Sequence, residues 1–223
     1  NAWWKPAPTR PDPLDAPMTA LPPVLQRLRD AVARLPQVEA LVLSGSRARR
    51  EVPADPHADI DLYVFTRADI PLAQRERLVA QAGGGHAIEM DQRFWGLSDH
   101  WIDPDSGLAL DVNHFDAGRM ADMIDRVLLR HEPSMGYSTC FWHTVRQAQV
   151  LFDRDGWFRD LQQRAQADYP EPLRRAIVAL NHPVLRGIGT SYLAQIDKAV
   201  ARQDPVSLNH RLAALLASYF DCV

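Results

Sequence analysis

Cysteine and lysine are both scarce in this 223-residue sequence, and it has no long apolar run. Two cysteines, Cys140 and Cys222, are too few for a disulfide framework, so we expect a protein of the reducing cytoplasm. The apolar runs are too short to cross a bilayer. A signal peptide is not expected, because the sequence does not open with a charged segment followed by an apolar one. We therefore expect a cytoplasmic protein without a membrane partner.

An excess of basic charge is also missing. The chain has 25 lysines and arginines against 28 aspartates and glutamates, a net charge of -3. This balance excludes a global positive field of the kind that holds nucleic acid, so we expect no nucleic-acid partner, although a local basic groove stays possible. Arginine carries almost all of the basic charge, because the only lysines are Lys5 and Lys198. Lys198 therefore deserves separate consideration.

The pattern of apolar residues divides the chain into three parts. Residues 1–23 contain seven prolines and are expected to form an extended arm. The next part mixes two periodicities, which predict helices over 24–35 and 72–82 and strands over 38–43, 60–65, 86–95 and 108–115. The last part is predicted to be helical throughout, over 118–131, 139–152, 156–167, 172–181, 189–202 and 205–223. We predict an α+β core with a small mixed sheet over 24–116, followed by an all-α helical bundle domain over 117–223.

Two acids, separated by one residue, lie at the start of the predicted strand over 60–65 and directly before it. Alternate residues of a strand share a face, so Asp59 and Asp61 point the same way while Ile60 and Leu62 point into the core. Two carboxylates this close repel each other, and one pKa rises unless a cation lies between them. Mg²⁺ or Mn²⁺ would resolve the repulsion, because these ions prefer oxygen ligands. A solvated edge-strand face is the alternative, which adjacent like charges disfavour.

A turn that could hold phosphate precedes the acid pair. Gly45 and Ser46 follow a predicted buried strand and begin a helical turn, and twelve residues separate Ser46 from Asp59. Glycine lets the backbone approach a ligand closely, and N–H groups at a helix start bind phosphate together with a serine hydroxyl. Ser46 could instead simply cap the turn. Next to a metal-binding acid pair, the turn suggests nucleotide chemistry. One of the arginines that follow could neutralise phosphate charge, or all could form surface ion pairs: Arg47, Arg49 and Arg50.

A third acid, Asp111, is flanked by apolar residues in the predicted strand over 108–115. If this strand pairs beside the acid pair, Asp111 can reach the same site. There it could bridge a second metal ion or accept the proton of an attacking hydroxyl. Capping a turn or pairing with an arginine are the other possibilities. His57 and His114 lie near the acids in the sequence and could support them or have no role.

These motifs resemble those of the DNA polymerase beta-like nucleotidyltransferase superfamily: Gly-Ser, twelve residues, Asp-hydrophobic-Asp-hydrophobic, and a later acid on a strand. The helical remainder resembles the C-terminal bundle of stand-alone bacterial members such as the aminoglycoside nucleotidyltransferases. Ser44 departs from the family pattern, which has a hydrophobic residue before the glycine. The resemblance implies that a nucleoside monophosphate is moved from a nucleoside triphosphate (NTP), first of all ATP, to a hydroxyl of a small molecule or protein, with release of pyrophosphate.

The resemblance also implies roles for individual residues. Gly45 and Ser46 would hold the β- and γ-phosphates, Asp59 and Asp61 would ligate two metal ions, and Asp111 would be the third catalytic and metal-binding acid. Related enzymes often supply a lysine from the helical part to the triphosphate, which would make Lys198 a nucleotide ligand, with Arg49 as a second cation. The solvated face of a helix is the simpler interpretation of Lys198. It is predicted to lie opposite a buried stripe that consists of Tyr192, Leu193, Ile196, Ala199 and Val200.

Two other function classes remain open. An antitoxin-type or regulatory protein could keep this fold and act by binding a partner protein, although the presence of all three acids favours an enzyme. An RNA-modifying transferase is disfavoured by the lack of a basic stripe. The sequence does not identify the acceptor or the nucleotide.

Overall fold

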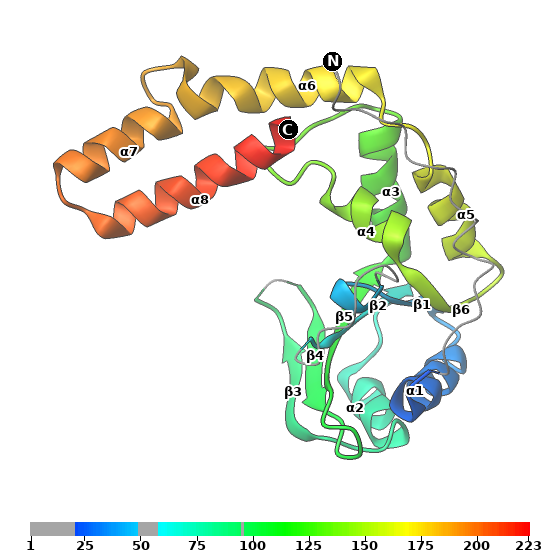
Figure 1. The fold of residues 1–223 in the computed structure, drawn as a ribbon. Helices are drawn as coiled ribbons and strands as arrows, with labels where there is room; N and C mark the ends of the chain where they lie inside the picture. The colour runs from blue at the N-terminus through cyan, green and yellow to red at the C-terminus, as the bar shows by residue number, and fades with distance from the viewer. Residues whose placement is uncertain (1–20, 49–57, 95) are drawn as a thin grey trace, which may run out of the picture.

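The computed structural model describes residues 21–48, 58–94 and 96–223 (Figure 1). Within them one sheet is formed by β1 (Val38–Leu43), β2 (Ile60–Thr66), β3 (His86–Gln92), β4 (Ser98–Ile102), β5 (Ala109–Asp116) and β6 (Gln149–Asp153). The helices are α1 (Pro23–Ala33), α2 (Leu72–Gln81), α3 (Ala117–Leu128), α4 (Cys140–Gln147), α5 (Trp157–Ala165), α6 (Glu171–His182), α7 (Tyr192–Ala201) and α8 (Pro205–Cys222). Two short helical turns are η1 (Ser46–Ala48) and η2 (Pro183–Gly187).

The sheet is mixed, with the strand order β3-β4-β5-β2-β1-β6. β2 and β5 run parallel, and the other neighbours are antiparallel. Helices follow from α3 onward, with β6 between α4 and α5. The predicted fold class, an α+β core followed by a helical region, is therefore confirmed.

Each face of the sheet is covered by its own helices (Figure 1). Ile60, Leu62 and Val64 of β2 point to one face of the sheet and pack in the core that α1 and α2 cover. Phe65 and Ala40 belong to the second core, on the side of α3, α4 and α5. Burial of apolar surface of this kind stabilises by about 25 cal/mol per Å². The functional residues of β2 therefore sit on a strand that is fixed from both faces.

A buried polar network links α2 to the sheet. The Arg75 guanidinium donates to Asp99 on β4 and, at 2.6 Å, to Asp91 Oδ1. His114 Nε2 lies 2.9 Å from Asp99 Oδ2. Burial acts to raise the pKa of Asp99, but the hydrogen bonds from His114, Arg75 and the Asp91 N–H together hold it below its ordinary value. A charge this deeply buried depends on its partners.

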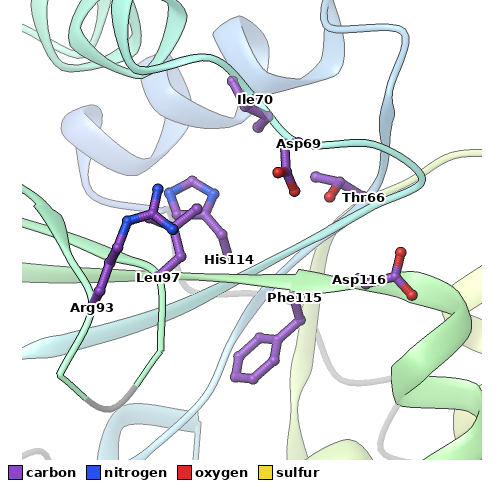
Figure 2. A pocket seen from close by; sticks show the side chains of 8 residues that line it. All are labelled: Thr66, Asp69, Ile70, Arg93, Leu97, His114, Phe115 and Asp116. Atoms are coloured by element: carbon purple, nitrogen blue, oxygen red, sulfur yellow. The ribbon is translucent and has the colours of Figure 1, made fainter.

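A small polar cavity adjoins this network at the carboxyl ends of β2 and β5. Its volume is about 130 Å³, and it is lined by Thr66, Asp69, Ile70, Arg93, Leu97, His114, Phe115 and Asp116 (Figure 2). The Nδ1 atom of His114 is buried without a hydrogen-bond partner from the described residues. A polar cavity of this size holds a few water molecules, which would satisfy such an atom.

Three strands differ from the sequence predictions: β3, β4 and β6. The helix expected over 139–152 ends as α4 at Gln147, and β6 then pairs with β1. The segment predicted to be all-helical thus contributes a strand to the sheet, because the β1 edge offers hydrogen bonds that no local pattern reveals. The strand expected over 86–95 ends at Gln92, and β4 was not predicted. β4 contains Asp99, which is buried only because Arg75 and His114 reach it.

The α6–α8 region forms an arm in which α8 packs on α6 and α7 (Figure 1). Its base is tied down by polar contacts, since Asp221 near the end of α8 accepts from the N–H and hydroxyl of Ser138. None of the described helices is long and apolar enough to cross a lipid bilayer. The division into domains at 1–23, 24–116 and 117–223 stays a prediction, and residues 1–20 lie outside the described part.

Candidate functional site

Three acids meet near the starts of the inner strands β2 and β5. They lie on the sheet face that also carries Tyr63 and Phe65. In the parallel pair β2–β5, Asp61 and Asp111 are direct register partners. Asp59 comes immediately before β2. One carboxylate oxygen of each of the three residues lies within 4.8 Å of the others. The condition set for Asp111, that its strand lies beside the acid pair, is therefore met.

The electrostatics of this cluster fit a cation. Burial raises the pKa of Asp61, and the charges of Asp59 and Asp111 raise it further. The ion pairs among the described residues include none that joins an arginine or lysine to any of the three acids. Clustered carboxylates that no described arginine or lysine neutralises are a suitable donor set for a hard divalent ion. The residues present therefore fit Mg²⁺ or Mn²⁺.

The turn after β1 lies directly against Asp61. The Ser44 N–H donates to the Asp61 carbonyl oxygen at 2.8 Å, and Gly45 has φ of +64°. A Cβ atom at Gly45 would lie 1.8 Å from Asp61 Oδ2. Only glycine allows the backbone to approach Asp61 this closely. The predicted position of Gly45 beside the acids therefore requires a residue without a side chain. Ser46 begins η1 and is exposed, as a phosphate ligand requires.

Ser44, the residue that departs from the family pattern, is buried. Its side chain acts to lower the pKa of the Tyr63 phenol. Burial outweighs this effect and, with the charge of Asp61, raises the pKa of Tyr63 overall.

Arg47 connects the turn to the acid pair. Its Nε atom donates to the carbonyl oxygens of Ala58 and Asp59 at 2.9 and 3.0 Å, and its Nη2 atom donates to Ala58 at 2.6 Å. These bonds hold η1 against the segment that leads into β2. Arg49 and Arg50, the other arginines of which one could neutralise phosphate charge, lie outside the described residues.

Sequence reasoning missed His100. On β4 it is the register partner of Asp111, and its Nδ1 atom lies 3.1 Å from Asp111 Oδ1. The turn over 103–107 was the available signal, because a strand before that turn would pair with the strand after it. His114, in contrast, belongs to the opposite side of the sheet and contacts Asp99, so it does not support the acids. His57 lies outside the described residues.

A cavity of about 390 Å³ borders the acids on the side of β3 and β4. It is lined by Glu89, Gln92, Phe94, Ser98, His100 and Asp111. Asp111 therefore belongs both to the acid cluster and to the wall of this cavity. Among the residues that the structure describes, none that lines it is a lysine or arginine. A ligand in the cavity would meet carboxylate, amide and hydroxyl groups and one imidazole.

Lys198 is not brought to the acids. It is exposed on α7, which packs on α8 and η2 and lies at the outer end of the arm, away from the sheet (Figure 1). The predicted buried stripe on this helix is also wrong in part, since Leu193 and Val200 are exposed while Ser191 is buried. Ser191 is buried because it caps the helix, accepting from the Ala194 N–H. A nucleotide-binding role for Lys198 stays a prediction.

No family model matches the sequence, and no curated protein matches it. Among solved structures, the chain is similar to a nucleotidyltransferase-like protein from Exiguobacterium sibiricum 255-15, with 14% sequence identity and a TM-score of 0.37. The match covers 87% of this chain and 54% of the other, so the chain spans about half the length of that structure.

Proposed function

We propose that the protein is a metal-dependent nucleotidyltransferase of the EC 2.7.7 type. It would move a nucleoside monophosphate from an NTP, first of all ATP, to a hydroxyl of a small molecule or protein. The observation that carries this proposal is the meeting of Asp59, Asp61 and Asp111, with oxygens within 4.8 Å of one another, beside the close turn at Gly45.

The residues divide the work as follows. The three carboxylates would hold Mg²⁺ or Mn²⁺, up to two ions, which supply charge neutralisation for the phosphates. The N–H groups after Gly45 and the Ser46 hydroxyl would bind the β- and γ-phosphates. Arg47 keeps this turn and Asp59 in register through the carbonyls of residues 58 and 59. Arg49 and Lys198 stay candidates for further contacts to the nucleotide.

The transfer itself is an in-line displacement. The acceptor oxygen forms a bond to the α-phosphorus, the bond from that phosphorus to the bridging oxygen breaks, and pyrophosphate leaves. Asp111 faces the cavity over β3–β5, so it would take the proton of a hydroxyl that enters from there. Because none of the described residues that line this cavity is a lysine or arginine, we expect an acceptor without phosphate or carboxylate groups.

A second candidate function is an antitoxin-type protein that binds a partner protein. The observation in its favour is the apolar surface of the α6–α8 arm, where Val200, Val206 and Phe220 are each more than half exposed. Exposed apolar patches often mark protein contacts.

The proposal is tested by calorimetric titration of ATP in the presence and absence of Mg²⁺. We expect binding by the wild type that requires Mg²⁺ and is lost in Asp59→Ala/Asp61→Ala, because the metal ligands are removed. The matched control is Asp122→Ala/Asp197→Ala, which removes two exposed acids on α3 and α7 and should bind as the wild type does.

Unchanged binding in the Asp59/Asp61 variant would contradict a nucleotide site at these acids. If the wild type binds none of ATP, GTP, CTP and UTP, the result favours the partner-binding function over the nucleotidyltransferase.

A further inference from the structure

His100 and Asp111 form a pair on rigid backbone. They face each other across β4 and β5, and both side chains are partly open, at 33% and 40% exposure. Their neighbours on the other side of the same strands, Trp101 and Leu110, are 1% and 0% exposed. The strands that carry the pair are therefore fixed by the core, while the pair itself faces a cavity.

The contact assigns a direction to the imidazole. A carboxylate oxygen accepts hydrogen bonds, so Nδ1 of His100 donates to Asp111 Oδ1 across 3.1 Å. The Nε2 atom has no hydrogen-bond partner among the described residues, and the ring lines the cavity together with Ser98 and Glu89. One nitrogen thus holds an acid of the cluster, and the other is left for whatever enters the cavity.

Holding one oxygen of a carboxylate fixes the direction of the other. Without His100, the Asp111 side chain could rotate away from Asp61, whose charge repels it. Supporting residues of this kind matter because a metal site needs its ligands in place before the ion arrives.

We propose that His100 is a positioning residue. It holds Asp111 through Nδ1 so that the three acids form one metal site, and its Nε2 side is where the acceptor hydroxyl is received. This inference rests on the proposed function. It adds a residue on β4 and an entry side that the resemblance does not imply.

Two substitutions separate the imidazole nitrogens. In His100→Asn the amide nitrogen can take the place of Nδ1 and still donate to Asp111. In His100→Gln the amide nitrogen reaches the place of Nε2 instead. Ser98→Ala is the matched control, because Ser98 shares the strand, the face and the cavity with His100 and is absent from the acid cluster.

The probe is Mn²⁺ alone, with the free ion followed by electron paramagnetic resonance, and thermal melts check that each variant is folded. We expect His100→Gln to lose about 10- to 100-fold in Mn²⁺ affinity, the usual effect of removing a residue that orients a ligand. His100→Asn and Ser98→Ala should stay close to the wild type.

Wild-type affinity in His100→Gln would overturn the proposal, and so would a His100→Asn variant as weak as His100→Gln. The proposed function would survive either result, provided that Mn²⁺ binding still depends on Asp59 and Asp61. A wild type that binds no Mn²⁺, or binds it equally well as Asp59→Ala/Asp61→Ala, removes the proposed function and this inference with it.

Discussion

Asp61→Asn will stabilise the metal-free protein while abolishing its metal binding. The stability effect follows from the raised pKa of Asp61, whose first cause is burial and whose second is the charge of Asp59. The folded protein then holds the Asp61 proton more tightly than the unfolded chain does. Stability is therefore lost as the pH rises from the ordinary value of 3.8 through the raised folded-state value. Asparagine has no proton to lose, so the variant escapes this cost.

We expect Asp61→Asn to change stability modestly and metal binding strongly. A gain of 1 kcal/mol would raise the melting temperature of a protein of this size by about 2–4 °C, and solvent screening at the partly exposed cluster reduces the gain. The loss of Mn²⁺ affinity should exceed the 10- to 100-fold effect of a supporting residue, because a direct ligand is removed.

The measurement is a pair of melting curves against pH without metal, followed by a Mn²⁺ titration. The difference in melting temperature between variant and wild type should be near zero at about pH 3 and grow toward neutral pH. Asp197→Asn makes the same charge change on exposed α7 and should show neither effect. A variant that melts below the wild type at neutral pH would show that the cluster does not repel itself.

Gly45→Ala should destroy the site by displacing Asp61. An added Cβ would lie 1.8 Å from Asp61 Oδ2, far inside the contact distance of atoms that are not bonded to each other, so either the turn or the acid must move. The positive φ of +64° adds about 1–2 kcal/mol of backbone strain. We expect a loss of Mg²⁺-dependent ATP binding together with a lower melting temperature.

Gly84→Ala separates the two causes. Gly84 also has a positive φ, +77°, but a Cβ there would meet nothing within 4 Å. Its variant should lose stability to a similar extent and keep full metal and nucleotide binding. Equal binding losses in the two variants would indicate that backbone strain, not contact with Asp61, explains the effect.

Local pattern was sufficient for the first half of the site. Asp59 and Asp61 share a face because a strand alternates with a period of two, and Gly45 precedes them by a spacing visible in the sequence. The third acid could only be placed conditionally. Asp111 reaches Asp61 through the parallel pairing of β2 with β5, and that pairing joins segments about 50 residues apart.

The misses have one physical cause, which is that long-range partners decide them. β4 is held between β3 and β5, with Asp99 buried against Arg75, and His100 reaches Asp111 only once β4 lies beside β5. The segment of β6 forms a strand and not part of a helix because it pairs with the edge of β1 that β2 leaves open. The stripe predicted on α7 is wrong in part, because helical periodicity does not show which face of a helix its neighbours cover.

The most direct test of the account is the position of a bound metal ion. Crystals of the wild type soaked with Mn²⁺ would be measured near the manganese absorption edge, and an anomalous difference map would locate the ion. The account predicts a peak among the carboxylates of Asp59, Asp61 and Asp111. A map with manganese bound elsewhere and no peak among these three acids would contradict it.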